Sequence, residues 1–192
     1  MRTSLDGDLG VPDAELVARY AAGDQSAARA LTERHAPRVF ALARRMLRET
    51  AEAEDVTQEA MLRLWRIAPA WEDRAAVGTW LYRVASNLCI DRMRKRRPIS
   101  GEPLPEVPDE APGVLRRLEA RDRAAAVDAA LAALPERQRA AIVLRHFEDR
   151  SNPEIAAVLD LSVEAVESLL ARGRRALAAA LVGRRAELGF IE

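Results

Sequence analysis

Residues 51–97 read AEAEDVTQEAMLRLWRIAPAWEDRAAVGTWLYRVASNLCIDRMRKRR, and the rest of the chain is interpreted around this stretch. It begins with acidic residues at helical spacing, continues through a loop that contains Pro69, and ends in a basic run. All three tryptophans of the protein lie inside it. The acidic end suits a basic protein surface, whereas the aromatic and basic end suits nucleic acid.

The acidic half predicts one amphipathic helix over residues 51–67. Its apolar residues recur at helical spacing and form a single stripe; they are Ala53, Val56, Ala60, Leu64 and Ile67. Other side chains lie off the stripe; they are Asp55, Gln58, Glu59, Leu62 and Arg66. Acidic residues in a first turn also favour the helix dipole, so a solvated face without any partner is the alternative.

The basic half predicts a loop over residues 68–78 and a helix over 79–97 that Thr79 caps. Five of the six residues from Arg92 to Arg97 are basic, which exceeds what a helix C-terminus needs. Such density beside aromatic residues is typical of a surface that binds a phosphate backbone with bases stacked nearby.

The segment before this stretch predicts three further helices. Asp13 is expected to cap the first, Gly23 to end it, Asp24 to cap the second, and Pro37 to open the third. Residues 1–12 are polar and are expected to fray. Because sustained strand alternation is absent and β-branched residues are sparse, the sequence predicts an all-α fold.

Residues 98–113 predict a linker between two small helical domains. This segment holds five of the ten prolines, four acidic residues and no basic residue. Such a composition does not bury a core, and 16 extended residues span roughly 50 Å. The linker is either a passive tether or a negatively charged segment that imitates a nucleic acid strand in a basic channel.

The domain after the linker, residues 114–182, contains a predicted helix-turn-helix. Ser151 and Glu154 form a capping box, Asp160 lies at the turn, and Ser162 caps the following helix. A plain helical hairpin is the alternative. The outer face of the last helix would enter the major groove; it carries Glu164, Ala165, Glu167, Ser168, Ala171, Arg172, Arg174 and Arg175. Glu167 could accept a hydrogen bond from a cytosine amine, whereas the arginines suit phosphates.

Composition restricts the remaining function classes. Acidic and basic residues balance at 30 each, which disfavours a protein that coats DNA non-specifically. Cys89 is the only cysteine, and His35 and His146 lack metal-ligand spacing, so we expect no disulfide, no metal and no cofactor. An enzyme is therefore disfavoured. No signal peptide or membrane-spanning run is apparent, which predicts a soluble cytoplasmic protein.

Four motifs in order now point to a known family. They are DVTQE at 55–59 with LWR at 64–66, TWLYRVA at 79–85 with Asn87 and IDR at 90–92, LPERQR at 134–139, and the helix-turn-helix. Together they resemble the extracytoplasmic-function (ECF) sigma factors of bacterial RNA polymerase, over roughly residues 13–182. The resemblance implies an alternative sigma subunit that directs core polymerase to promoters, promotes melting of the −10 element, and serves a stress or environmental response.

The resemblance also implies roles for particular residues. A domain over 13–97 would bind core polymerase and the −10 element, and one over 114–182 would bind the −35 element, followed by a tail at 183–192. The clamp coiled coil of the largest polymerase subunit would be contacted by Asp55, Gln58, Glu59, Leu62 and Arg66. The −10 strand would be contacted by Trp71, Trp80, Arg83, Asn87, Arg92, Arg94 and Arg96. The −35 duplex would be contacted by Ser162, Glu164, Glu167, Ser168, Ala171, Arg172, Arg174 and Arg175. An anti-sigma factor is a further expected partner.

Some residues depart from the family pattern and keep alternatives open. Many relatives carry basic residues where this chain has Glu167 and Leu169, so its −35 preference cannot be copied from a generic member. Asp149 stands where the family usually has glycine. A helix-turn-helix regulator that is not a sigma subunit is one competing interpretation. An inhibitor that holds polymerase without reading promoters is another.

Overall fold

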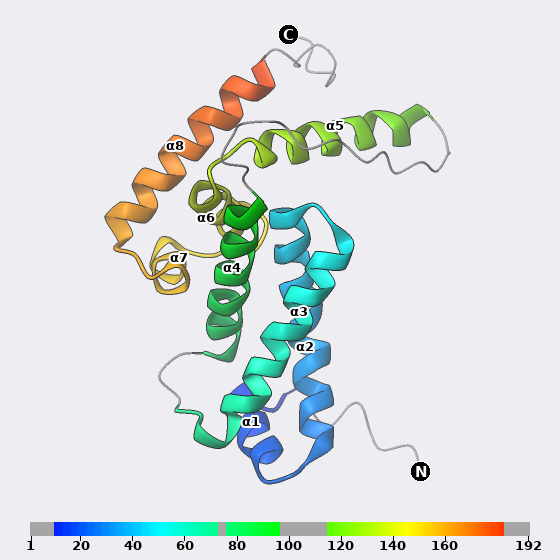
Figure 1. Cartoon of the computed structure of the whole chain (residues 1–192), viewed down its shortest axis with the longest axis vertical. Coiled ribbons are helices and arrows are strands. Elements are labelled where there is room, and N and C mark those ends of the chain that lie inside the picture. The colour runs from blue at the N-terminus through cyan, green and yellow to red at the C-terminus, as the bar shows by residue number, and fades with distance from the viewer. Residues whose placement is uncertain (1–9, 73–75, 97–114, 183–192) are drawn as a thin grey trace.

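The structure, a computed structural model, describes residues 10–72, 76–96 and 115–182 (Figure 1). These residues form helices α1 to α8 and a short 3-10 helix, η1, with no strand among them. The prediction of an all-α fold is confirmed. The linker at 98–113, the tail at 183–192 and the first nine residues of the expected N-terminal segment lie outside the described residues. Within the described part, no helix is both long and apolar enough to cross a lipid bilayer.

The first half of the chain is arranged around one long helix, α2. Its elements are α1 (Asp13–Ala21), α2 (Gln25–Leu47), α3 (Thr50–Ile67), η1 (Ala68–Ala70) and α4 (Val77–Arg96). α2 packs against α1, α3 and α4, and α3 and α4 also pack against each other. The predicted apolar stripe of α3 is buried from Ala53 to Leu64, but Ile67 at its end is 37% exposed. As expected, α3 ends shortly before Pro69, at Ile67.

Pro37 lies inside α2 and does not open a separate helix, so that prediction is wrong. A proline within a helix removes one backbone hydrogen bond, which usually ends or kinks the helix. Here the buried residues on either side of it, Leu31, His35, Val39 and Ala43, follow one another at four-residue spacing. The continuous buried face compensates for the lost hydrogen bond and keeps α2 in one piece.

Two predicted helix starts differ from the observed ones. Pro12, not Asp13, is the N-cap of α1, and the Asp13 carboxylate instead contacts Arg34 and lies 2.8 Å from His35 Nε2 on α2. α4 begins at Val77, two residues before the expected cap Thr79, because Val77 is itself buried in the core. The predicted cap of α2 is confirmed, since the Ser26 N–H donates to Asp24 Oδ1 at 2.9 Å.

The second half contains α5 (Leu115–Ala132), α6 (Glu136–His146), α7 (Asn152–Leu159) and α8 (Val163–Val182). The capping box is confirmed: the Ser151 N–H donates to Glu154 Oε2 at 2.8 Å, and the Glu154 N–H donates to Ser151 Oγ at 3.4 Å. Asp160 takes the left-handed conformation with φ 55°, and the Ala165 N–H donates to Ser162 Oγ at 3.2 Å. Helices α7 and α8 with this turn form the predicted helix-turn-helix.

A glycine fixes how closely α8 approaches α6. A Cβ atom added at Gly173 would lie 2.8 Å from Ile142 Cγ1, which is closer than real Cβ contacts come. Val166 and Leu170 are buried on the same side of α8. This side therefore belongs to the core, and the opposite side is exposed.

The two halves of the chain contact each other. α7 packs against α4, and α6 packs against both α2 and α4 (Figure 1). Buried apolar residues from both halves, such as Met46 and Ile90 in the first and Ile142 and Ile155 in the second, belong to one continuous hydrophobic cluster. The halves are therefore closed on one another in this structure.

Candidate functional site

The outward face of α3 carries the five side chains that the resemblance assigns to polymerase contact. Asp55, Gln58, Leu62 and Arg66 are exposed, and Glu59 is half-buried. Arg63 Nε donates to Glu59 Oε1 at 2.8 Å, and this bond lowers the pKa of Glu59. Leu62 is 41% exposed. A single exposed leucine is ordinary in itself, so its surroundings decide its significance.

Two grooves flank α3, and Leu62 and Gln58 line both of them. The groove between α2 and α3, here called the apolar groove, is lined by Thr32, Ala36, Phe40, Glu54, Thr57, Gln58, Met61, Leu62 and Trp65. The groove between α3 and α4, here called the polar groove, is lined by Asp55, Gln58, Glu59, Leu62, Arg63, Leu88, Asp91, Arg92 and Lys95. The face of α3 is thus a ridge between one apolar and one charged depression.

Sequence reasoning missed the outer walls of both grooves. These walls are formed by Phe40 of α2 and by Leu88, Asp91 and Lys95 of α4. The available signal was the spacing of these last three residues, which recur every three or four positions along α4. That spacing predicts one common face but does not say which neighbouring helix the face meets.

Two tryptophans meet at the start of α4. The rings of Trp71 and Trp80 pack edge to face with centroids 5.8 Å apart, and both are partly buried against the core. The Trp71 indole N–H is buried and has no acceptor among the described residues. Residues 73–75 of the predicted loop lie outside the described residues. Trp80 is half-buried, so its ring packs on the core and keeps part of its surface exposed.

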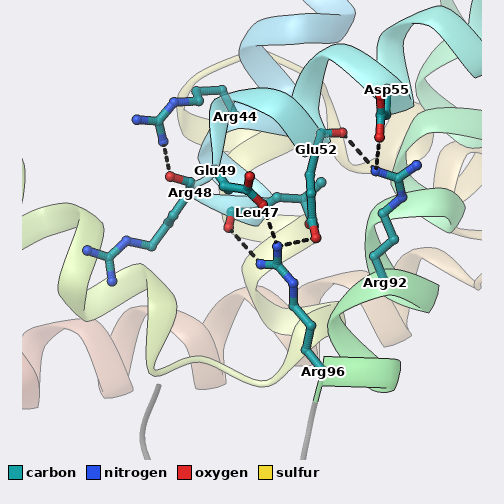
Figure 2. Close-up of polar contacts among 8 residues, drawn as sticks. All are labelled: Arg44, Leu47, Arg48, Glu49, Glu52, Asp55, Arg92 and Arg96. Atoms are coloured by element: carbon teal, nitrogen blue, oxygen red, sulfur yellow. Dashed lines mark hydrogen bonds and ion pairs between the residues drawn. The ribbon is translucent and has the colours of Figure 1, made fainter. Parts of the chain in front are cut away.

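The cations of α4 fall into two groups. Arg83 and Arg94 are exposed, as is Asn87, although Arg83 Nη2 lies 3.5 Å from Asp160 Oδ2 in the helix-turn-helix. Arg92 and Arg96 instead point toward the beginning of α3 (Figure 2).

The Arg92 and Arg96 guanidinium groups bind several acceptors there, as Figure 2 shows. Arg96 donates to Glu49 Oε2 at 2.9 Å and to the Leu47 carbonyl at 3.3 Å, and it also pairs with Glu52. Arg92 donates to the Glu52 carbonyl at 3.0 Å and lies 3.7 Å from Asp55 Oδ2. The two arginines therefore join the C-terminal end of α4 to the N-terminal end of α3.

The outer face of α8 presents the predicted −35 residues to solvent. Ala171 is half-buried, and the remaining members are exposed: Ser162, Glu164, Glu167, Ser168, Arg172, Arg174 and Arg175. Hydrogen bonds from its own backbone N–H and from Ser162 lower the pKa of Glu164, so this carboxylate is engaged at the helix N-terminus. Arg172 Nε donates to the Ser168 carbonyl at 3.3 Å. The exposed acidic and neutral residues precede the basic ones along the helix.

The residues considered for disulfide or metal chemistry, Cys89, His35 and His146, differ in their exposure. Cys89 is fully buried, and burial raises the pKa of its thiol to about 12. His35 is buried, and its burial lowers its pKa more than the neighbouring Asp13 raises it. His146 is exposed. Among the described residues, no group of three or more histidine, cysteine, aspartate or glutamate side chains could hold a metal ion.

Two family models match the chain on either side of the linker. Sigma-70 region 2 matches residues 31–99, and sigma-70 region 4 matches residues 124–177. The first match contains α3 and α4, and the second contains the helix-turn-helix.

Curated and solved proteins give the same picture. The chain is 37% identical over 166 residues to the ECF RNA polymerase sigma factor SigM of Mycobacterium tuberculosis, covering 86% of this chain and 83% of SigM. It is 31% identical to SigW of Bacillus subtilis, covering 81% and 89% of the two chains. CnrH, solved with the cytosolic domain of CnrY, is similar with a TM-score of 0.68 and 31% identity, covering 88% of this chain and 96% of CnrH.

Proposed function

This chain belongs to the extracytoplasmic-function sigma factors of bacterial RNA polymerase, alternative sigma subunits that direct core polymerase to promoters, and we propose that it divides that task among three surfaces. The ridge of α3 binds core polymerase, the start and outer side of α4 bind the −10 element, and the outer face of α8 binds the −35 element. The observation that carries the polymerase assignment is the exposed Leu62 ridge with a groove on either side.

We propose that a two-helix coiled coil of the polymerase clamp straddles α3. One helix of the coil would place apolar side chains against Phe40, Met61 and Trp65 in the apolar groove. The other helix would lie along the polar groove, where Asp91 and Lys95 offer charges of both signs. Interfaces typically combine an apolar centre with a polar rim, and Leu62 occupies the centre of this one.

At the −10 element, the protein must compensate the cost of unstacking a base, which is a few kcal/mol. Trp71 and Trp80 offer aromatic surface, and the buried Trp71 indole N–H has no acceptor among the described residues. Arg83, Asn87 and Arg94 are exposed along α4 and suit the strand backbone. Because Arg92 and Arg96 bind the start of α3, they act by positioning α4.

At the −35 element, base reading and backbone binding fall on different turns of α8. Glu167 and Ser168 are exposed and suit base edges, with Glu167 accepting from a cytosine amine. Arg172, Arg174 and Arg175 follow and suit phosphates. This division supports a −35 preference set by this chain's own acidic residue.

The partners define where the protein works. Because core polymerase and the chromosome are its targets, we place the protein in the cytoplasm, on the nucleoid when active. We assign it no catalytic chemistry of its own, in keeping with the non-enzymatic role of the family. An anti-sigma factor is a further proposed partner. CnrH was solved bound to a cytosolic domain, and the sigma factor RpoE of Bartonella quintana, which shares the fold, was solved with an anti-sigma factor.

Run-off transcription tests the proposal. Core polymerase is supplied with a panel of genomic promoters, with and without this protein, and promoter-dependent transcripts are expected only in its presence. Leu62→Asp should abolish them together with core binding, whereas Ile67→Asp, at a similarly exposed residue that lines neither groove, should leave both intact. Core binding without transcripts would favour an inhibitor. If Leu62→Asp and Ile67→Asp bound core polymerase and supported transcription equally well, the ridge would not be the polymerase contact.

A further inference from the structure

The exposed side of α3 carries opposite charges toward its two ends. Asp55 lies in the first half of the helix and Arg66 in its last turn, and both are exposed. Leu62 follows Asp55 by seven positions and precedes Arg66 by four, a spacing that places all three on one stripe. Glu54 beside Asp55 is exposed as well, and so is Arg63 beside Leu62. The stripe therefore changes from acidic through apolar to basic along the helix.

Such a stripe is complementary to a second copy of itself when the two helices are antiparallel. At about 1.5 Å of rise per residue, Asp55 and Arg66 are about 16 Å apart along α3, and their midpoint lies within about 3 Å of Leu62. A two-fold axis through this midpoint places Asp55 of each copy opposite Arg66 of the other. It also brings the two copies of Leu62 side by side. A parallel pairing would instead place like charges opposite one another, which is unfavourable.

The apolar groove gives each Leu62 a place to pack. This groove lies beside the stripe, between α2 and α3, and Phe40, Met61 and Trp65 line it. Leu62 is 41% exposed and Met61 only 5%, so the leucine projects from the surface while the methionine lies at the bottom of the groove. The ridge of one copy can therefore enter the groove of the other, as packed helices commonly do. By symmetry, each copy contributes one ridge and one groove.

This side of α3 is accessible in the described part of the chain. Both grooves beside α3 are lined only by residues of α2, α3 and α4. The helix packs mainly on α2, α4 and η1, on the side of the first half away from α7 (Figure 1). The formal net charge of the chain is zero, so two copies approach each other without strong long-range repulsion.

We propose that the free protein forms a two-fold symmetric homodimer through the ridge of α3, with the two α3 helices antiparallel. The inference rests on the proposed function in one respect: the dimer covers the surface assigned to core polymerase, so dimer formation and polymerase binding exclude each other. A contact of one ridge and one groove from each copy belongs to the small interfaces, below about 1,200 Å², which are typically transient. We therefore expect a dissociation constant on the order of 10 µM.

Sedimentation velocity of the full chain, without polymerase, tests the dimer. At low salt, the wild-type protein should change from monomer to dimer as its concentration rises past about 10 µM. Leu62→Asp should stay monomeric, because it places a charge at the centre of the contact. Added salt should weaken the wild-type dimer, since its flanking ion pairs are exposed. A wild-type chain that is still monomeric at about 200 µM would overturn the proposal.

Charge reversals test which residues face each other. Asp55→Arg and Arg66→Asp each turn both ion pairs of the symmetric dimer into like-charge contacts, so each variant alone should dimerise at least about tenfold more weakly. In an equimolar mixture, the reversed position of one variant faces the reversed position of the other, and the two native positions also face each other. The mixture should therefore regain the affinity of the wild-type dimer.

The chain with both substitutions distinguishes antiparallel from parallel pairing. In the antiparallel dimer its two copies again place opposite charges together, so it should dimerise with itself and not with the wild-type chain. A parallel dimer predicts the reverse, namely pairing with the wild-type chain and not with itself. That reverse result would overturn the proposed arrangement.

Substitutions on α8 are the matched controls. Arg175→Asp and Glu167→Arg make the same changes in net charge at exposed positions that line neither groove, and they should dimerise like the wild-type chain. Circular dichroism checks that each variant is folded. If Asp55→Arg unfolds, Arg66→Asp against Arg175→Asp decides the question. Equal dimerisation of these last two would show that the ridge is not the contact.

A titration with core polymerase separates this inference from the proposed function. If the free chain dimerises as described but does not bind polymerase, the proposed function fails and the dimer stands. If the chain binds polymerase but remains monomeric when free, only the dimer is wrong. With both correct, polymerase should convert the dimer into complexes that hold one copy of the chain. A complex of polymerase with the intact dimer would overturn the mutual exclusion.

Discussion

Two sets of arginines in this protein were predicted to bind DNA, and they differ in what they contact. Arg92 and Arg96 at the end of α4 are bound to carboxylates and carbonyls at the start of α3 (Figure 2). Arg174 and Arg175 on α8 are exposed. The comparison teaches that a basic run in a sequence shows where positive charge lies along the chain but not what each side chain contacts. The contact depends on the acidic residues that the fold brings near it.

The largest expected effect is on the free energy of unfolding, and it should differ between Arg96, which binds acidic partners, and the exposed Arg94. Arg96→Ala should lower the free energy of unfolding by about 2 kcal/mol, because it leaves Glu49 and Glu52 without their shared partner in a partly buried site. Arg94→Ala, an exposed neighbour, should change it by less than about 0.5 kcal/mol. Urea denaturation measures both. Equal losses would remove the distinction between held and exposed arginines.

The arginines of α8 should affect binding and leave stability unchanged. Arg174→Ala combined with Arg175→Ala should weaken binding to a −35 duplex about tenfold, or about 1.4 kcal/mol, and reduce the salt dependence by about two counterions. The loss should be the same on a duplex of unrelated sequence, since phosphate contacts carry no sequence information. A loss confined to the cognate duplex would show that these side chains read bases.

Low pH should weaken the second half of the chain through Glu154, which caps α7 and also binds Arg150. Hydrogen bonds from Ser151, and then from Arg150, lower the pKa of Glu154 from 4.5 to about 2. Since the folded pKa is the lower one, this stabilisation is present above about pH 5 and is lost as the pH falls toward 2. Glu154→Gln should cost about 1 kcal/mol at pH 7, the size of a cap, and almost nothing at pH 2. Glu167→Gln, on the exposed face of α8, is the control and should be neutral at both values.

The smallest expected effect concerns the ion pair between Asp55, predicted to contact polymerase, and Arg92, predicted to contact the −10 strand. Asp55 Oδ2 lies 3.7 Å from Arg92 Nη1, and the Asp55 side chain is 66% exposed. Exposed pairs of this kind contribute at most about 0.5 kcal/mol. A double-mutant cycle of Asp55→Asn with Arg92→Ala should give a coupling free energy below that value. A coupling above about 1 kcal/mol would mean that Arg92 is held mainly by Asp55 and not by the Glu52 carbonyl.

Local signals predicted the helix-turn-helix well because its determinants are close in sequence. Ser151, Glu154, Asp160 and Ser162 act within one or two turns of where they stand. Pro37 was misjudged because a buried face running along the whole of α2 outweighs a local breaker. Periodicity predicted the five residues of the α3 ridge but not the grooves beside it, since these require knowledge of which faces of α2 and α4 lie opposite.

The partners of the basic run at 92–97 could not be predicted from the sequence either, because their pairing depends on which helices lie side by side. Glu49 and Glu52 stand more than forty residues before Arg96, and only the antiparallel packing of α3 and α4 brings them together. The contact of Arg139 with Met46 spans an even longer separation of 93 residues. The pattern of charges along a chain therefore shows how many charged side chains there are, but it does not predict which of them form ion pairs.

Gly173 lies on the side of α8 that packs against the core, whereas the residues predicted to contact DNA lie on the opposite side. Because a Cβ atom there would meet Ile142, the packed side of the helix tolerates little variation. Arg172 and Arg174 beside it, like Glu167 and Ser168 earlier in the helix, are exposed and can be exchanged at little cost in stability. Over evolutionary time, duplicated copies of such a gene can therefore acquire new promoter preferences by surface substitutions alone, while the scaffold that presents them is inherited unchanged.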